Sequence, residues 1–363
     1  MHIKKIKINN YRNYNEAEIS FHEKMNILYG DNAQGKTNIL ESIYICATTK
    51  SHQGSKDKEI IKMGCDEAHV KMYIEKEGLE HYIDLHLKKN KPKGIAVNGI
   101  PIKRSAELMG IINIVLFSPE DLNIIKNGPS ERRRFIDMEL CQLSRIYLDN
   151  LYRYSKVLNQ RNHLLKQISY NESLKETLSV WDEQLIKYGT EIIKERKEFI
   201  EQINNISAEI HKKLTGEKEF LNIQYEPNVD AEEFADKLYK NYNRDIYYQI
   251  THTGPHRDDI KFISNDMDLR TYGSQGQKRT AALSLKLSEI EIVKKKTGDI
   301  PVLLLDDVLS ELDRSRQNYL LESIDDVQTI ITCTGLEEFI NHSLDVNRIY
   351  KIENGNVTDI EMR

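Results

Sequence analysis

Apolar and polar residues alternate over the first part of the chain in the pattern of β-strands. Three such runs follow one another within residues 3–29, and the third ends in the apolar pair Ile27 and Leu28. A period of two predicts strands that bury one face. The same argument predicts four more strands, at residues 67–76, 81–88, 94–98 and 111–117. The first third of the chain is therefore expected to be mainly β-sheet.

After residue 118 the period lengthens to between three and four, as in helices. One apolar stripe covers residues 136–165, and a second covers residues 174–210 with a single break at 195–196. Ser173 followed by Glu176 fits a capping box, which predicts that the second helix opens there. A helix of about 40 residues spans roughly 60 Å. We therefore expect a compact helical lobe, too short to be a long coiled-coil arm.

Strand patterns return from residue 220. They predict strands at residues 247–250, 260–264, 302–305 and 329–332, with the last of these closing the fold. The fold class is thus α/β, with mixed sheets plus helices and an inserted α-helical lobe. The predicted boundaries are 1–118 for the first part of the main lobe, 119–219 for the helical lobe and 220–363 for the second part of the main lobe. A length of 363 residues fits this division.

Composition narrows the classes of function that the chain can have. The net charge is −5, so DNA binding would have to depend on local basic patches. Four cysteines form no C-x-x-C pair, which argues against a zinc site or a disulfide framework. The sequence has no run of 18 apolar residues and no signal-peptide pattern. We expect a cytoplasmic protein that does not enter a membrane.

One segment fits the phosphate-loop pattern G-x-x-x-x-G-K-[ST]. It lies between a predicted strand and a predicted helix and comprises Gly30, Asp31, Asn32, Ala33, Gln34, Gly35, Lys36 and Thr37. The glycines let the backbone wrap a phosphate, and the helix N-terminus adds partial positive charge. Lys36 is expected to reach the β- and γ-phosphates, and the Thr37 hydroxyl to hold Mg²⁺. The pattern predicts a site for a nucleoside triphosphate.

Two further segments carry the chemistry that such a site needs. The apolar strand at 302–305 ends in Asp306 and Asp307. Asp306 is placed to hold Mg²⁺ through water, and Asp307 to orient or deprotonate the attacking water, although two acids could instead cap the next helix. Residues 273–277, Gly-Ser-Gln-Gly-Gln, open a helix whose N–H groups could meet a phosphate.

The order of these segments along the chain resembles that of the ABC-type ATPases of the SMC class. The segments are the phosphate loop, the insertion, Ser-Gln-Gly-Gln, Leu-Leu-Leu-Asp-Asp and then Ser-Glu-Leu-Asp at 310–313. Within that class, three segments are similar to the bacterial RecF family: Tyr-Arg-Asn-Tyr at 11–14, Gly-Pro-His-Arg-Asp-Asp at 254–259 and Gly-Ser-Gln-Gly-Gln at 273–277. The resemblance runs from residue 1 to the strand at 329–332. It implies an ABC-type ATPase lobe with ATP and Mg²⁺ as cofactors.

The resemblance also implies how such a protein works. Ser274, Gly276 and Gln277 of one subunit would meet the γ-phosphate of ATP on another, in an ATP-dependent homodimer. The resemblance implies that the chain binds single-stranded, double-stranded and gapped DNA. The family acts with RecO and RecR to help load RecA at gaps. Slow ATP hydrolysis would release the DNA and so act as a timer.

Several positions depart from the wider ABC pattern. Transport-type relatives usually place Asp-Glu where this chain has Asp306 and Asp307. Residues 273–277 correspond to the signature of ABC-type ATPases, usually Leu-Ser-Gly-Gly-Gln, and Gln275 stands at its middle position. The switch histidine that ABC-type ATPases carry after the last strand is missing, and Thr332 and Thr334 stand in its place. The glutamine of the magnesium-sensing loop, expected after Phe117, is missing as well. The Asp pair, the missing histidine and the helical insertion argue against the ATPase subunit of an ABC transporter. The insertion is too short for an SMC-like chromosome organiser.

Some basic and polar residues have open assignments. By similarity alone, Arg12 and Asn13 contact the nucleotide, whereas His256 and Arg257 either line the site or brace the lobes. The candidates for sequence-independent DNA contact are Lys88, Lys89, Lys91, Lys93, Lys103, Arg104, Arg132, Arg133 and Arg134. A solvated basic face explains each of these positions equally well.

Overall fold

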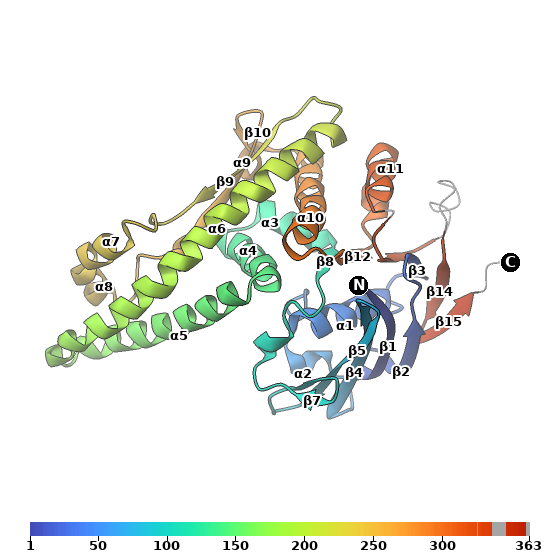
Figure 1. Cartoon of the computed structure of the whole chain (residues 1–363), viewed down its shortest axis with the longest axis horizontal. Helices are drawn as coiled ribbons and strands as arrows, with labels where there is room; N and C mark the ends of the chain where they lie inside the picture. Colours follow the sequence, from blue (N-terminus) through green and yellow to red (C-terminus); the bar gives the residue numbers. More distant parts are fainter. Residues whose placement is uncertain (325, 336–345, 361–363) are drawn as a thin grey trace. The chain divides into compact units, whose positions relative to one another are not determined.

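The computed structural model describes residues 1–324, 326–335 and 346–360 (Figure 1). Its contacts divide the chain into two compact units. Unit 1 comprises Met1–Asp121 and Glu289–Arg363, and unit 2 comprises Leu122–Ser288. The sequence grouped residues 220–288 with the main lobe, whereas their contacts lie in unit 2 with the helical segment. A strand pattern in the sequence predicts that a strand forms, but it does not predict the unit in which the strand packs.

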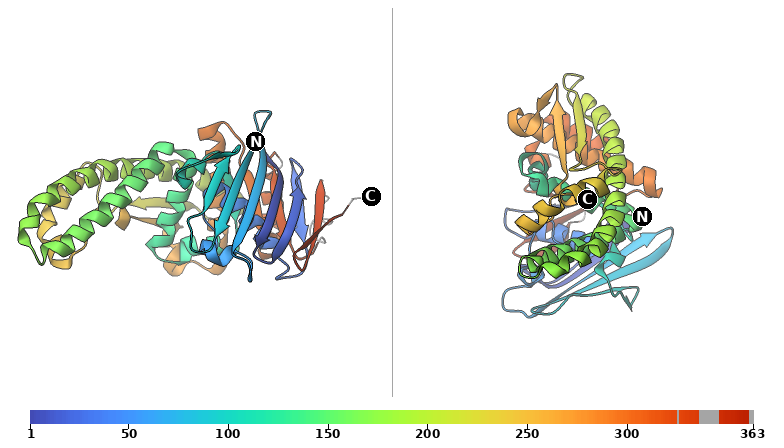
Figure 2. Two further views of the ribbon diagram at one scale, coloured as in Figure 1. Left: turned by 90° about the horizontal axis from the view of Figure 1, so that it is seen from below. Right: turned by 90° about the vertical axis from the view of Figure 1, so that its left-hand side faces the viewer.

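The first sheet of unit 1 is antiparallel and has the order β2-β1-β4-β5-β6-β7. Its strands are β1 (His2–Tyr11), β2 (Tyr14–Ser20), β4 (Glu67–Lys76), β5 (Leu79–Lys88), β6 (Gly94–Val97) and β7 (Ile100–Pro101). Burial alternates along β1 and β4, as the sequence pattern predicts for strands with one covered face. Figure 2 shows these strands side by side.

The second sheet of unit 1 is mostly parallel and has the order β15-β14-β3-β13-β12-β8. Its strands are β3 (Met25–Tyr29), β8 (Ile114–Phe117), β12 (Val302–Asp306), β13 (Thr329–Cys333), β14 (Arg348–Glu353) and β15 (Asn356–Ile360). All residues of β8, β12 and β13 are buried, which explains their continuous apolar runs. The prediction that the strand at 329–332 closes the fold is wrong, because β14 and β15 follow it.

Helix α1 (Lys36–Thr48) joins both sheets into one core. Its apolar residues belong to the same buried cluster as side chains of β1, β4 and β12. Among the residues that the structure describes, unit 1 also contains the short α2 (Asp57–Ile60) and α11 (Arg314–Glu322) and the last residues of α10 (Gln275–Thr297). Because α1 begins at Lys36, within the phosphate loop, burial of this helix also holds the loop in place.

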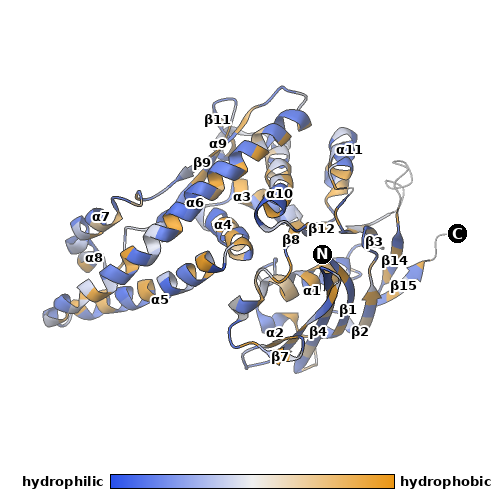
Figure 3. Ribbon diagram, in the orientation of Figure 1, coloured by the Kyte–Doolittle hydropathy of each residue, from blue (hydrophilic) through white to orange (hydrophobic). Residues whose placement is uncertain are grey.

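Unit 2 is built on a pair of long helices that lie side by side, α5 (Arg145–Ile168) and α6 (Leu178–Leu214) (Figure 2). Around them lie α3 (Leu122–Lys126), α4 (Pro129–Leu143), α7 (Phe234–Lys240), α8 (Tyr242–Tyr248), α9 (Leu269–Tyr272) and most of α10 (Gln275–Thr297). A small antiparallel sheet has the order β11-β10-β9, formed by β9 (Leu221–Glu226), β10 (Asp259–Ser264) and β11 (Met267–Asp268). Polar residues cover most of the visible face of α6 (Figure 3).

Two local predictions in unit 2 are wrong. The second long helix begins at Leu178, because Asn171 caps a 3₁₀ segment at Glu172–Thr177 that precedes it. The residues expected to form a strand at 247–250 instead end helix α8, whose buried face carries Asp245. A run of aromatic residues favours a strand locally, and here tertiary contacts override that preference. No helix among the described residues is long and apolar enough to cross a membrane.

Candidate nucleotide-binding site

The phosphate loop of unit 1 connects the end of β3 to the start of α1. Gly30 has φ 155° and Gly35 has φ 112°, values that residues with a side chain rarely adopt. A Cβ at Gly35 would lie 2.5 Å from the Asn13 side chain, and a Cβ at Gly30 would collide with the Ile352 carbonyl oxygen. Both glycines are therefore required by the shape of the loop.

Lys36, the first residue of α1, is largely buried. Its ammonium donates hydrogen bonds to the carbonyl oxygens of Gly30 at 2.5 Å and Asp31 at 2.7 Å. Burial lowers the pKa of Lys36, and the charge of Asp307 opposes that shift. The side chain thus curls over the loop, where an anion would meet it.

Asn13, which the resemblance predicts to contact the nucleotide, lies against the phosphate loop. Its amide donates to the Gln34 carbonyl at 2.9 Å and accepts a hydrogen bond from Asn38 at 2.9 Å. Its neighbour Arg12 behaves differently, because the guanidinium donates to both carboxylate oxygens of Glu41 at 2.6 and 2.7 Å. Arg12 therefore braces α1 in this structure.

Glu41 is fully buried in α1 and collects several donors. Besides Arg12, the hydroxyls of Tyr11 and Ser51 donate to its carboxylate. Burial raises the pKa of Glu41, but the hydrogen bonds from Arg12 and Ser51 outweigh it and lower the pKa. Sequence reasoning missed Glu41, because a single acid within an apolar helix gives no signal of its partners.

The two acids at the end of β12 lie beside the loop. The Thr37 hydroxyl donates to Asp306 Oδ1 at 2.8 Å, so the two residues predicted to hold Mg²⁺ do converge. A hydroxyl and a carboxylate are hard oxygen ligands of the kind that Mg²⁺ prefers, and the pair therefore fits the ion. Burial raises the pKa of Asp306, whereas hydrogen bonds from Thr332 and Thr37 lower it in part.

The sequence assigns no role to Thr332, whose hydroxyl connects the Asp306 carboxylate to the Asp307 backbone. Its hydroxyl donates to Asp306 Oδ1 at 2.8 Å and accepts the Asp307 backbone N–H at 2.9 Å. Asp307 has φ 53°, in the left-handed region. The parallel register pairs Asp306 with Thr332, which is why these residues meet across the sheet.

Asp307 lines a cavity of about 150 Å³ at the carboxyl ends of β12 and β13. Ser310, Thr332, Cys333 and Thr334 also contribute to its wall. Ligands of open α/β sheets bind at this edge, because the loops that follow the strands gather there. The predicted loop, acids and cavity therefore belong to one region of unit 1.

The signature residues lie in unit 2, at the start of α10. Ser274 and Gly276 are exposed and Gln277 is half-buried. Ser274 and Gln277 exchange hydrogen bonds, with the Gln277 N–H donating to Ser274 Oγ at 3.2 Å and the Ser274 N–H donating to Gln277 Oε1 at 2.9 Å. This is a capping box, formed by residues that were predicted to meet a phosphate.

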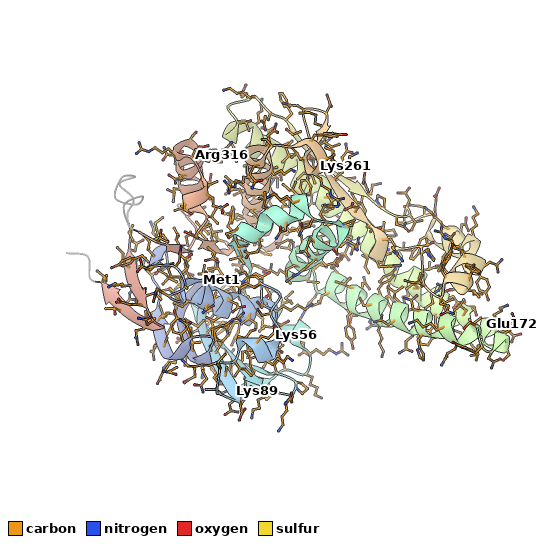
Figure 4. The ribbon with its side chains drawn as sticks, turned by 180° about the vertical axis from the view of Figure 1, so that it is seen from behind. Met1, Lys56, Lys89, Glu172, Lys261 and Arg316 are labelled. Atoms are coloured by element: carbon orange, nitrogen blue, oxygen red, sulfur yellow. The ribbon has the colours of Figure 1, made fainter. Side chains whose placement is uncertain are left out.

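The lysines proposed for DNA contact divide into two groups. Three have partners within unit 1, namely Lys88 with Glu67, Lys89 with Asp66 and Lys93 with Asp57. Lys89 projects at the edge of the strands (Figure 4). Lys91 and Lys103 are exposed, and no ion pair is found for either among the described residues. Arg104 is exposed as well and has a partner.

The structure separates the run of three arginines. Arg132 is 2% exposed and donates to both carboxylate oxygens of Asp259, at 2.5 and 2.9 Å, so it is wrong as a candidate for DNA contact. Arg133 is half-buried and donates to the Asp258 carbonyl at 2.7 Å. Arg134 is exposed and has a partner. A basic triplet in a helix points in three directions, which its sequence does not reveal.

His256 is a brace within unit 2. Tyr154 OH lies 2.7 Å from its Nδ1, and the Thr251 carbonyl lies 3.0 Å from its Nε2. A carbonyl can only accept, so Nε2 carries the hydrogen and Tyr154 donates to Nδ1. Burial lowers the pKa of His256 to about 4. Arg257 next to it is exposed.

Known proteins resemble this chain over nearly all of its length. Residues 2–358 match the family described as RecF/RecN/SMC N terminal domain. The chain is 62% identical to the DNA replication and repair protein RecF of Lachnoclostridium phytofermentans, over 98% of this chain and 99% of that protein. It is 57% identical to the RecF of Agathobacter rectalis, over 99% of this chain and 100% of that protein.

Solved structures give the same answer. One described as the recombination mediator protein RecF-ATP in the RecFOR pathway has a TM-score of 0.91 and 38% identity, covering 99% of both chains. An Smc head domain from Pyrococcus furiosus has a TM-score of 0.58 and 19% identity, covering 99% of this chain and 96% of that one, and shows the shared fold. The α/β fold of the ABC-type ATPases, predicted from the sequence, is confirmed.

Proposed function

Because the chain belongs to the RecF family, we propose that it is an ATP-dependent DNA-binding protein of recombinational repair and replication restart. The observation that supports this most directly is the contact of Thr37 with Asp306 at 2.8 Å, beside a phosphate loop with intact geometry. It brings together the hydroxyl and the carboxylate that a nucleotide site of this class needs.

In this proposal the loop of residues 30–37 binds the phosphates of ATP through its N–H groups and Lys36. Thr37 and Asp306 would hold Mg²⁺, which when bound neutralises phosphate charge. Asp307 orients the attacking water from the wall of the neighbouring cavity. Its side chain is shorter than the glutamate usual in transporters, and we infer weak ATP hydrolysis that serves as a timer.

We further propose that two copies of the chain close over two ATP molecules. The phosphate loop and the signature lie in different compact units, and Ser274 and Gly276 are exposed in unit 2. These exposed signature residues are then available to complete the nucleotide site of a second copy. Ser274, Gly276 and Gln277 of one subunit would meet the γ-phosphate held by Lys36 of the other.

The ATP-bound dimer is proposed to bind single-stranded, double-stranded and gapped DNA, and to act with RecO and RecR in loading RecA. The relatives that carry the RecF name support this pathway. Lys91 and Lys103 are the strongest candidates for phosphate contact, since both are exposed without an ion pair among the described residues. Such contacts would be independent of DNA sequence and sensitive to salt.

The first experiment measures binding to gapped duplex DNA with and without ATP and Mg²⁺, while light scattering follows the oligomeric state. We expect binding and dimerisation to appear together with ATP. Dimerisation without DNA binding would keep the nucleotide site and overturn the proposed DNA role.

Two variants test the nucleotide site itself. Lys36→Ala should abolish ATP-dependent dimerisation, and a dimer that survives this change would contradict the assignment of the loop. Ser274→Arg should leave ATP binding by the monomer intact while blocking dimerisation. A collapse of ATP affinity in that monomer would show that the signature acts within its own subunit.

A further inference from the structure

The first turn of α10 orients the Ser274 hydroxyl. In the capping box, the Ser274 oxygen accepts the Gln277 N–H, at 3.2 Å. A hydroxyl that accepts with its oxygen keeps its own hydrogen for another acceptor. That hydrogen is therefore available to an oxygen atom arriving from outside unit 2.

A second contact fixes the side chain that closes this box. Gln277 Nε2 donates to Glu219 Oε1 at 3.2 Å, while Gln277 Oε1 accepts the Ser274 N–H at 2.9 Å. If the amide turned over, a donor would face the Ser274 N–H and an acceptor would face a carboxylate. Glu219 thus selects the one amide orientation in which the box is closed.

Glu219 is itself attached to the end of α6. Its backbone N–H donates to Thr215 Oγ1 at 3.3 Å, and its carboxylate Oε2 lies 3.5 Å from Nε2 of the fully buried His211. His211 Nδ1 lies 3.0 Å from the Ser284 hydroxyl of α10.

One turn earlier on α6, Ser207 donates to Ser288 at 2.9 Å. We call these three contacts of the α6 segment with α10 (207–288, 211–284 and 219–277) the polar seam. It joins the long helix of unit 2 to the start of the signature helix.

We propose that Glu219, supported by His211, is a positioning residue for the signature. It holds Gln277, and through Gln277 it presents the Ser274 hydroxyl to the terminal phosphate of ATP on a second copy of this chain. The polar seam then passes a displacement of α6 to the surface that closes on the other subunit. This inference rests on the proposed ATP-dependent dimer.

The test uses the full-length chain with Glu219→Ala. The dissociation constant of the ATP-dependent dimer, measured by light scattering over a dilution series, should rise by about 3–10-fold, since Gln277 must then be ordered during association. Binding of a fluorescent ATP analogue to the monomer should not change. Glu219→Gln keeps an acceptor oxygen and should dimerise as the natural chain does. Glu217→Ala removes the same charge from an exposed position in the same turn and is the matched control.

A double-mutant cycle asks whether Glu219 acts through Gln277. Glu219→Ala should have no further effect on the dimer constant once Gln277→Ala is present. Additive effects, or a Glu219→Ala chain that dimerises normally, would overturn the inference. Ser274→Arg separates this result from the proposed function, because dimerisation of that variant with ATP would overturn the arrangement between subunits itself.

Discussion

Unit 1 and unit 2 bury charge for different purposes. In unit 1 three of the buried charged groups, Lys36, Glu41 and Asp306, lie in or next to the phosphate loop and α1, and the main apolar core is a continuous cluster dominated by isoleucine and leucine. Unit 2 buries Arg132, Arg161 and Arg196, which are 2%, 0% and 2% exposed. Most of the buried charge of unit 1 therefore lies at the candidate site, whereas the buried arginines of unit 2 join segments of the fold.

Arg196 illustrates the second use. Its guanidinium donates to Asp137 at 2.7 Å, Asp258 at 2.9 Å and the Pro255 carbonyl at 2.7 Å. It thereby connects α6 to α4 and to the turn before β10. A buried ion pair of this kind need not add stability compared with apolar residues, but removing one partner leaves a charge without compensation. The comparison predicts that substitutions in the two units lower stability through different contacts.

The largest effect is expected from Arg196→Ala. The Asp258 carboxylate is 1% exposed and would lose its guanidinium, which should lower the free energy of unfolding by about 3–5 kcal/mol. Trp181 is the single tryptophan of the chain and lies in α6, so its fluorescence during urea unfolding reports on unit 2. Arg153→Ala, at an exposed arginine of α5, is the control and should change stability by less than about 1 kcal/mol. Equal effects of the two variants would contradict a structural role for the buried charge.

A comparable but smaller loss is expected in unit 1 from Leu304→Ala. Leu304 is fully buried in β12 between β13 and β8, and the change should destabilise this unit by about 2–5 kcal/mol. Hydrogen exchange of the β12 amides should accelerate while the Trp181 transition stays where it is. Leu304→Ile nearly conserves volume and should lose less than about 1.5 kcal/mol. A shift of the Trp181 transition would show that the units do not unfold separately.

Acidification should affect unit 2 through His256. Its pKa is about 4 when folded, compared with about 6.5 in an unfolded chain. Between these values the unfolded chain binds more protons, so this contribution is complete above pH 6.5 and is lost as the pH falls toward 4. Lowering the pH from 7 to 5 should remove about 2 kcal/mol from the stability reported by Trp181. His256→Gln cannot titrate and should reduce that slope, and an unchanged slope would assign it to other groups.

The smallest effect is expected from Thr332→Val, which keeps the shape of the side chain but removes the bridge between Asp306 and Asp307. Affinity for ATP in the presence of Mg²⁺ should fall by about 3–10-fold, because Asp306 and Asp307 each lose a hydrogen bond that holds them in place. Thr332→Ser restores the hydroxyl and should restore the affinity. If valine and serine behave alike, the hydroxyl does not position the acids.

The sequence predicted unit 1 better than unit 2. Thr37 of the phosphate loop and Asp306 at the end of β12 meet in the structure, because a strand, a loop and a helix in fixed order bring them together. In unit 2 the break seen at residues 195–196 contains Arg196, which is a core residue. A pattern of apolar residues cannot register a buried arginine whose acids lie 59 and 62 positions away.

The sequence by itself determined most of the strands, the two long helices and the phosphate-loop pattern, since each follows from preferences that act within a few residues. The tertiary structure alone decided that Arg132 is buried against Asp259, that Thr332 bridges the acids and that Glu219 holds Gln277. These contacts join residues between 26 and 127 positions apart. A charged side chain contributes through its partner and its burial, and both exist only once the chain has folded.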